Sequence, residues 1–314
     1  MEIPPYIRAE IERLTQDTDV KRLEAAARRL SENNRREENV SASDKHELLA
    51  YCVTRMPATF GAVSRALELT LEKFAKTGSI SSVLDAGAGT GAAAIAAELL
   101  TDCGDNITCL ERDRNMLELG RQFAKNARWK EYDITKGINE KADLVICSYC
   151  LNELPENQRK PVTASLAKAA DKLLLITEPG TPKSFERLKN TRAELIDMGM
   201  KIIAPCPSDK PCPLPENDWC HFTARVSRSK LHKLLKGGDA PYEDEKFCFL
   251  AAVWEDDISA EGSSRIIRHP IIEAGKITLR LCSEDGISDK MITRSSPLFK
   301  KARKSDTGDL FPLK

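Results

Sequence analysis

The 314-residue sequence lacks the features that mark several specialised classes of protein. Its 48 Lys and Arg balance its 48 Asp and Glu, which excludes a polycation that coats nucleic acid through net charge alone. No apolar run approaches the roughly 18 residues of a membrane-spanning helix, so we expect no membrane association. The first residues include the acids Glu2, Glu10 and Glu12 and no apolar core. This argues against a signal or transit peptide and favours a cytoplasmic protein.

Cysteine is also scarce by the standard of disulfide-stabilised proteins, in which it reaches roughly 8–10% of residues. The chain has ten cysteines. In a reducing compartment such thiols stay free, so a group of them points first to a metal ion or an iron–sulfur cluster.

The hydrophobic pattern divides the chain into three parts. Residues 1–76 predict helices over 6–14, 20–30, 45–54 and 62–74, because apolar positions recur at helical spacing. Met56-Pro57 breaks this pattern. Residues 77–255 form the second part, which includes a Pro-rich and Cys-rich insertion at 203–224. Residues 256–314 predict a small β extension with a basic tail, its strands at 265–267, 277–282 and 290–293.

The second part alternates short apolar runs with helical stretches. Its expected strands are 83–84, 107–110, 130–134, 143–147, 172–177 and 247–254. Its expected helices are 92–100, 115–127, 159–170 and 183–198. Strands separated by helices of this length form parallel sheets covered on both faces. The predicted fold class is therefore α/β.

A glycine-rich turn follows the first expected strand, in the sequence VLDAGAGTG at 83–91. Its glycines, Gly87, Gly89 and Gly91, let the backbone turn tightly and approach a ligand at the start of the next helix. Asp85 supplies a carboxylate, which suits a cationic ligand better than a pyrophosphate. The G-x-G-x-G order also resembles motif I of class I methyltransferases, so we favour S-adenosylmethionine (SAM) over a dinucleotide.

Two further acids complete this candidate SAM site. Glu111 ends the second expected strand, where a carboxylate can accept hydrogen bonds from both ribose hydroxyls. Asp133 ends the third expected strand, and the methyltransferase pattern implies contact between it and the adenine amino group. The alternatives are a dinucleotide site and a vestigial empty site in which both acids are ordinary strand-end residues.

The methyl acceptor is expected beside the loops that follow the fourth and fifth strands. Methyl transfer depends mainly on alignment of the reacting groups, so the sequence identifies no catalytic residue. The pocket candidates are Asn152, Glu153 and Glu178. Cys147 and Cys150 could be nucleophiles of the pyrimidine-C5 methyltransferase type. That class has a Pro-Cys dipeptide at this place, whereas Ile146 and Tyr149 precede the two cysteines here, so packing is the better interpretation.

Three cysteines of the insertion, Cys206, Cys212 and Cys220, fall within fifteen residues. The first two lie in Pro-Cys-Pro steps, and prolines beside thiolates are typical of ferredoxin-like sites, in which four cysteines hold an iron–sulfur cluster. His221 could replace a cysteine as a zinc or Rieske-type ligand. For the fourth ligand we choose Cys282, before a turn, over Cys248, which we expect to pack inside a strand.

Two basic runs stand out against the neutral total. The first comprises Arg225, Arg228, Lys230, Lys233 and Lys236, with no acid between them. The second includes Lys300, Lys301 and Arg303. Both predict contact with a phosphate backbone, although a solvated face is the simpler alternative. Aromatic residues are only 5% of the chain, which favours structured RNA over single strands.

Together these motifs resemble the methyltransferase-like family of small-ribosomal-subunit proteins of bacteria and mitochondria, the Rsm-twenty-two type. The resemblance covers nearly the whole chain. It is carried by RMPATF at 55–60, LDAGAG at 84–89, NEL at 152–154, EPGTP at 178–182, PCP at 205–207, WCHF at 219–222, YEDEKF at 242–247, ARK at 302–304 and GD at 308–309. Thr307 departs from the pattern, since the family usually has Trp there.

The resemblance implies a Rossmann-like sheet of the class I SAM-methyltransferase type. It also implies a [4Fe–4S] cluster on Cys206, Cys212, Cys220 and Cys282, with zinc as the alternative, and a role on the small ribosomal subunit and its rRNA. Two functions remain open. One is SAM-dependent methylation of rRNA, and the other is ribosome assembly by a catalytically inactive protein in which SAM and the cluster are structural. Away from the ribosome we expect a monomer.

Overall fold

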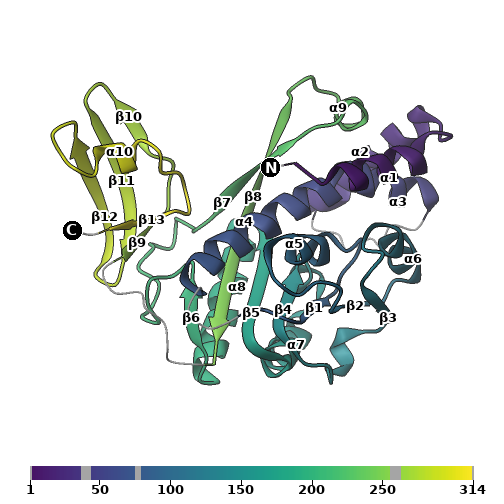
Figure 1. The fold of residues 1–314 in the computed structure, drawn as a ribbon, viewed down its shortest axis with the longest axis horizontal. Coiled ribbons are helices and arrows are strands. Elements are labelled where there is room, and N and C mark those ends of the chain that lie inside the picture. Colours follow the sequence, from purple (N-terminus) through teal and green to yellow (C-terminus); the bar gives the residue numbers. More distant parts are fainter. Residues whose placement is uncertain (1, 37–43, 75–78, 255–262, 313–314) are drawn as a thin grey trace.

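The computed structural model describes residues 2–36, 44–74, 79–254 and 263–312. The boundaries expected at 76/77 and 255/256 lie outside these residues. An eight-stranded sheet forms the centre of the molecule, and a separate five-stranded sheet stands at one end (Figure 1). None of the helices within the described ranges is both long and apolar enough to cross a membrane.

Four helices precede the central sheet, namely α1 (Pro5–Thr15), α2 (Val20–Arg36), α3 (Lys45–Thr54) and α4 (Met56–Phe74). Asp44 caps α3, since its carboxylate accepts hydrogen bonds from the backbone N–H groups of His46 and Glu47. The helix expected at 45–54 is confirmed as α3, and the break expected at Met56-Pro57 lies at Arg55, between α3 and α4. The expected start of the next helix at residue 62 is wrong. Pro57 lies in the first turn of α4, where a helix needs no N–H donor, so α4 begins earlier.

The central sheet has the strand order β3-β2-β1-β4-β5-β8-β6, and β7 pairs with β8. Its strands are β1 (Val83–Ala86), β2 (Ile107–Glu111), β3 (Arg128–Glu131), β4 (Ala142–Ser148), β5 (Ala170–Pro179), β6 (Lys201–Ala204), β7 (Phe222–Ser227) and β8 (Tyr242–Val253). Strands β3, β2, β1, β4 and β5 are parallel, as the sequence predicts. The antiparallel strand β8 lies between β5 and β6.

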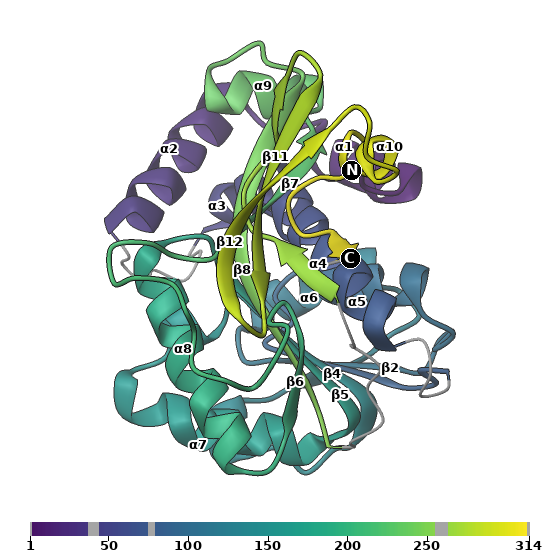
Figure 2. The same ribbon diagram turned by 90° about the vertical axis from the view of Figure 1, so that its left-hand side faces the viewer.

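Helices cover both faces of this sheet (Figure 2). They are α5 (Ala92–Leu100), α6 (Arg114–Phe123), α7 (Glu156–Ala169) and α8 (Pro182–Asp197). Because side chains alternate along a strand, Val83 packs in the core beneath α4 and α5, while its neighbour Leu84 packs in the core on the face of α7 and α8. This double cover leaves the carboxyl ends of the strands as the place for a site.

The first half of β8 leaves the sheet and pairs with β7 as a two-stranded ribbon. The short helix α9 (Lys230–Lys236) joins the two strands and packs against α2 and α3. In Figure 1 this ribbon projects away from the sheet beside the N-terminal helices. The basic run at 225–236 is therefore part of β7 and α9.

The C-terminal residues form a five-stranded sheet of their own. Its elements are β9 (Ser263–Ile266), β10 (Ile271–Glu273), β11 (Lys276–Ser283), β12 (Gly286–Thr293), α10 (Phe299–Ala302) and β13 (Leu310–Pro312). Ile266, Leu279 and Phe311 belong to its separate core. An ion pair of 2.6 Å between Arg65 of α4 and Asp309 fastens this sheet to the rest of the molecule.

Candidate functional site

The glycine-rich turn lies at the carboxyl end of β1, beside the boundary with β4 where the strand order reverses. Gly87, Gly89 and Gly91 have φ angles of 78°, 53° and 79°, in the left-handed region that favours glycine. A Cβ at Gly87 would lie 2.8 Å from the Sγ of Cys150, whereas a Cβ at Gly89 would meet no atom within 4 Å. Gly89 therefore faces open space.

Asp85 is fully buried at the end of β1. Its Oδ2 accepts a hydrogen bond of 3.0 Å from the backbone N–H of Ala94, but its Oδ1 has no hydrogen-bond partner. Burial raises the pKa of this carboxyl to about 7, against the effect of the Ala94 hydrogen bond. A buried carboxylate oxygen without a partner is costly, so a cationic ligand group that pairs with it binds favourably there.

Glu111 ends β2, as expected, and clamps the glycine-rich turn. Its Oε2 accepts a hydrogen bond of 2.7 Å from the N–H of Gly89, and its Oε1 accepts one of 2.8 Å from the N–H of Asp113. The sequence gives this carboxylate only a role toward ribose. Each carboxylate oxygen can accept a further bond, so the clamp leaves capacity for a ligand hydroxyl.

Asp133 does not end a strand, so that part of its expected placement is wrong. Strand β3 stops at Glu131, and Asp133 instead caps the short 3₁₀ helix η1 (Ile134–Lys136). Its Oδ1 accepts hydrogen bonds from the Thr135 hydroxyl at 2.8 Å and from the Thr135 N–H at 3.0 Å. The Thr135 hydroxyl bond is the main reason that the pKa of this carboxyl is lowered.

The acceptor-side candidates follow β4 and β5. Asn152 and Glu153 lie in the 3₁₀ helix η2 (Leu151–Glu153), and Glu178 lies near the end of β5. The fully buried Glu178 accepts a 3.1 Å hydrogen bond from the Leu151 N–H and lies 3.8 Å from Arg187. Burial raises its pKa to about 7, opposed by Arg187. The Oδ1 of Asn152 and the Oε2 of Glu178 have no hydrogen-bond partner.

A partly buried network on this side was not predicted from the sequence. The Tyr149 hydroxyl donates a hydrogen bond of 3.0 Å to Glu245 of β8, and Arg55, at the end of α3, donates two of 3.3 and 3.4 Å to the same carboxylate. The Arg55 guanidinium also lies 6.0 Å from the centre of the Tyr149 ring. Only the RMPATF and YEDEKF motifs, which contain Arg55 and Glu245, give a sequence signal for it.

A second candidate site is a cavity of about 240 Å³ between α8, the Cys-rich insertion and the C-terminal sheet. Its lining brings together the four predicted ligands, Cys206, Cys212, Cys220 and Cys282. Cys248 lines it too, and its thiol donates a hydrogen bond of 3.1 Å to the carbonyl of Cys220. His221 is not part of this lining, and its ring stacks on Trp219 with centroids 5.2 Å apart.

The partly buried thiols of Cys206, Cys220 and Cys282 favour the protonated form in the absence of a metal. Burial raises the pKa of Cys282 to about 12 and also raises the pKa of Cys206 and Cys220, with neighbouring cysteines adding to the effect. Across the ranges that the structure describes, no three His, Cys, Asp or Glu side chains are close enough to hold a single metal ion. The four thiols therefore surround a space without converging on one point.

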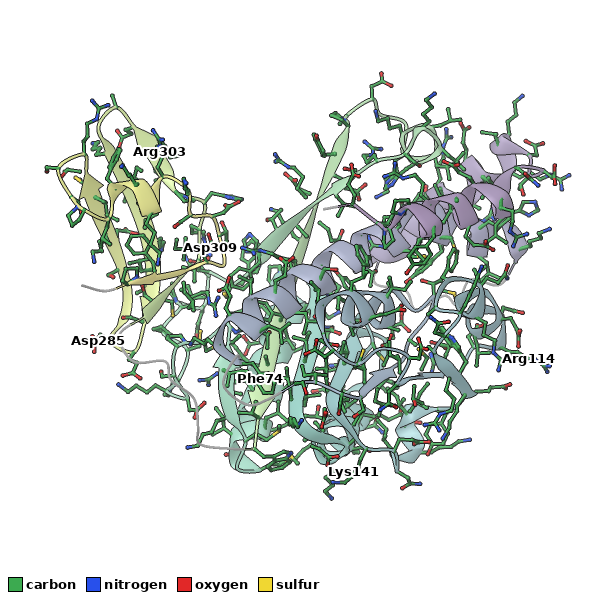
Figure 3. All side chains as sticks on the ribbon, in the orientation of Figure 1. Phe74, Arg114, Lys141, Asp285, Arg303 and Asp309 are labelled. Atoms are coloured by element: carbon green, nitrogen blue, oxygen red, sulfur yellow. The ribbon has the colours of Figure 1, made fainter. Side chains whose placement is uncertain are left out.

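The two basic runs differ in how their charges are paired. Arg225 forms two hydrogen bonds with Asp244, at 2.8 and 3.0 Å, and Lys236 contacts Glu243 at 2.5 Å. The largely buried Arg228 lies 4.0 Å from Glu243. In contrast, Lys300, Lys301 and Arg303 are exposed on and after α10, with no carboxylate partner among the described residues. Arg303 and Asp285 lie at opposite ends of the C-terminal sheet (Figure 3).

Comparison with known proteins gives a family match over most of the chain. The family model described as "Mitochondrial small ribosomal subunit Rsm22" matches residues 45–312. The human protein named "Ribosome assembly protein METTL17, mitochondrial" is 24% identical over 295 residues. That match covers 84% of this chain but 62% of METTL17, so the chain spans less than two thirds of this relative's length.

Similar solved structures are distant in sequence. A putative RNA methyltransferase, PH1948 from Pyrococcus horikoshii, is 14% identical, with a TM-score of 0.41 and coverage of 61% of this chain and 82% of that one. Magnesium protoporphyrin IX methyltransferase from Synechocystis with bound SAH is 16% identical, with a TM-score of 0.40 and coverage of 71% and 93%. The strand order itself confirms the expected Rossmann-like α/β fold.

Proposed function

Because the chain belongs to the Rsm22 family of mitochondrial small-ribosomal-subunit proteins, we propose that it is a SAM-binding, iron–sulfur-containing, methyltransferase-like protein of the small ribosomal subunit. The observation that supports the binding of two cofactors is a set of buried polar atoms that have no hydrogen-bond partner. Asp85, Asn152, Thr177 and Glu178 hold such atoms at the carboxyl edge of the sheet, and Arg192 and Arg265 hold them at the cysteine cavity. Folded proteins pair nearly all such atoms, so ligands are expected at both places.

The residues at the sheet edge fit SAM. The unpaired oxygen of Asp85 suits the cationic end of the ligand, and Glu111 suits the ribose hydroxyls while it holds the glycine-rich turn. Asp133 is the candidate for the adenine amino group. SAM supplies an electrophilic methyl group when bound. The contribution of the chain is to orient the ligand and to compensate for its positive charge.

The cysteine cavity fits a [4Fe–4S] cluster better than zinc. One tetrahedral zinc ion binds thiolates at about 2.3 Å, which requires sulfur atoms roughly 3.8 Å apart. Among the described residues no three His, Cys, Asp or Glu side chains are grouped to hold a single metal ion. The ligands of a cluster bind different irons and are spaced more widely. Four partly buried cysteines that line one largely apolar cavity supply the four thiols that such a cluster needs.

A ribosomal role is supported by the relative's name and by the charge distribution. METTL17 is named as a ribosome assembly protein. The exposed cations Lys300, Lys301 and Arg303 have no acidic partner among the described residues and suit a phosphate backbone, whereas Arg225 and Lys236 already have acidic partners. We therefore expect the α10 segment to contribute more to rRNA binding than the ribbon of β7, α9 and β8.

A second candidate, an inactive assembly factor, is favoured by the network of Tyr149, Glu245 and Arg55. Tyr149 directly follows β4, beside the glycine-rich turn, where a methyl acceptor is expected. Its ring and hydroxyl are held there by partners on two other elements. An acceptor base would have to displace this side chain, which a structural SAM site does not require.

The deciding experiment is mass spectrometry of small-subunit rRNA from a deletion strain, complemented with the wild type or with Asp85→Ala. Loss of one methylated nucleotide in both the deletion and Asp85→Ala strains supports methyl transfer. A complete set of modifications, together with defective subunit assembly, supports the assembly factor. Normal subunits and normal rRNA in the deletion strain would overturn the ribosomal proposal. Separately, iron and sulfide assays of anaerobically purified protein test the cluster, and zinc without iron would contradict it.

A further inference from the structure

Two buried arginines, one from β9 and one from α8, donate hydrogen bonds to backbone carbonyls of the Cys-rich insertion. Arg265 of β9 is 1% exposed, and it donates hydrogen bonds to the carbonyl of Pro205 at 3.2 Å and to that of Gly308 at 2.6 Å. Arg192 of α8 is 9% exposed, and its Nη2 donates to the carbonyls of Ser208 and Lys210 at 2.7 and 2.8 Å. Both side chains line the cavity that holds the cysteines.

Each arginine keeps one buried donor without a partner. These donors are the Nε of Arg192 and the Nη2 of Arg265. The nearest carboxylate to Arg265 is Glu72, at 3.9 Å, and no described carboxylate lies within 4.0 Å of Arg192. A buried guanidinium whose acidic partner is distant or missing is stabilised by another anion beside it. The lining of this cavity offers the cysteine thiolates and the carboxylates of Glu284 and Asp285.

The charges also balance. Four thiolates around a doubly positive [4Fe–4S] core, or around Zn²⁺, leave the centre with a double negative charge. Two guanidinium groups neutralise it. The lining also contains Lys189, Lys210, Glu284 and Asp285, whose two positive and two negative charges cancel.

We infer that Arg192 and Arg265 are positioning residues for the metal centre, which donate their unpaired N–H groups to its sulfur atoms and compensate for its charge. This inference rests on the proposed cluster. Hydrogen bonds to the sulfurs and nearby charge are the means by which proteins set the reduction potential of such clusters. One-electron reduction adds a further negative charge to the cluster, so the two guanidinium groups favour the reduced state.

The test compares Arg192→Met, Arg192→Lys, Arg265→Met and Arg265→Lys in the full chain, with Lys189→Met as the matched control. Lys189 lines the same cavity, but its side chain is 38% exposed and already pairs with Glu186. Each protein is reconstituted anaerobically, and dithionite titration followed by electron paramagnetic resonance gives the midpoint potential. Iron and sulfide content and circular dichroism check loading and folding.

We expect each Met variant to disfavour reduction at least tenfold, which lowers the one-electron potential by about 59 mV. The Lys variants should recover much of this shift, because they keep the charge, and Lys189→Met should change it little. Loaded, folded Met variants with the wild-type potential would overturn the inference while leaving the proposed cluster intact.

Other outcomes separate the inference from the proposed function. A wild-type protein that binds zinc alone contradicts the cluster, and the inference then predicts at least tenfold weaker zinc binding in the Met variants. Unchanged zinc affinity would overturn it. A wild-type protein that binds neither metal overturns both. If a Met variant does not fold, its Lys counterpart still decides, since charge compensation requires near-wild-type potential despite loss of the planar guanidinium.

Discussion

The Tyr149 hydroxyl donates a hydrogen bond of 3.0 Å to Glu245, which lies 96 residues further along the chain. The backbone of Tyr149 has a φ of 54°, in the left-handed region that residues with a Cβ rarely adopt. Its N–H donates to the Thr177 carbonyl at 2.7 Å. This conformation persists because partners on β5, β8 and α3 together hold the residue at the edge of the candidate SAM site.

Substitutions in this network should have unequal effects on stability. Tyr149→Phe removes one hydrogen bond to a carboxylate and should cost about 1–2 kcal/mol. Glu245→Gln should cost about 3 kcal/mol, because it leaves the largely buried Arg55 guanidinium without its anion. Urea unfolding of both single variants and the double variant measures the coupling. Additive effects would contradict a shared network.

Asp85 should make the ligand-free protein less stable as the pH rises. Its pKa is about 7 in the folded protein, against an ordinary value of 3.8. Between these values the folded state holds a proton that the unfolded state has lost, so the free energy of unfolding falls by up to about 1.4 kcal/mol per pH unit. Asp85→Asn removes this loss and should be more stable than wild type at pH 8, but not at pH 4.

Urea unfolding at several pH values measures this effect. A weaker slope should remain in Asp85→Asn, because Glu178 also has a pKa raised to about 7. Glu243, whose pKa is lowered to about 2, acts in the opposite direction but only below about pH 4.5, where its contribution to stability is lost on acidification. An Asp85→Asn variant no more stable than wild type at pH 8 would contradict the prediction.

Gly89 and Gly104 form a matched pair for testing the SAM site. Both have a φ of 53°, and a Cβ at either position would meet no atom within 4 Å. Alanine at each should therefore cost about the same stability, roughly 1 kcal/mol. Only Gly89→Ala places a methyl group where the ligand is expected, so calorimetry should detect at least tenfold weaker SAM binding for it alone. Equal SAM affinity of the two variants would count against the site.

The sequence predicts the central sheet well because local patterns determine its parts. Short apolar runs separated by helices give β1, β2, β4 and β5 within a few residues. The glycine-rich turn is recognisable in the sequence because its left-handed backbone requires glycine. Strands β6, β7, β10 and β13 were not predicted. The three or four residues of β6, β10 and β13 carry too little pattern, and β7 runs from the end of the Cys-rich insertion into the basic run.

The parts that depend on strand register were not predictable from composition. A basic run at 225–236 and an acidic run at 239–245 look like separate features in the sequence. The pairing of β7 with β8 sets Arg225 opposite Asp244 and Val226 opposite Glu243, which turns neighbouring charge runs into ion pairs. The same strand β8 brings Cys248 to the cysteine cavity, although its alternating pattern favoured simple packing.

The ion pair of Arg225 with Asp244 leads to a prediction on rRNA binding. Reversing the charges of Lys300, Lys301 and Arg303 to Glu should weaken binding to small-subunit rRNA, because these exposed cations have no described acidic partner. Releasing fewer counterions should reduce the slope of log affinity against log salt by roughly 3. Arg225→Glu is the control: it disrupts a pair with Asp244 on the ribbon and should change the slope by less than about 1. Filter binding over a range of salt concentrations measures both, and a larger effect of Arg225→Glu would assign the RNA contact to the ribbon instead.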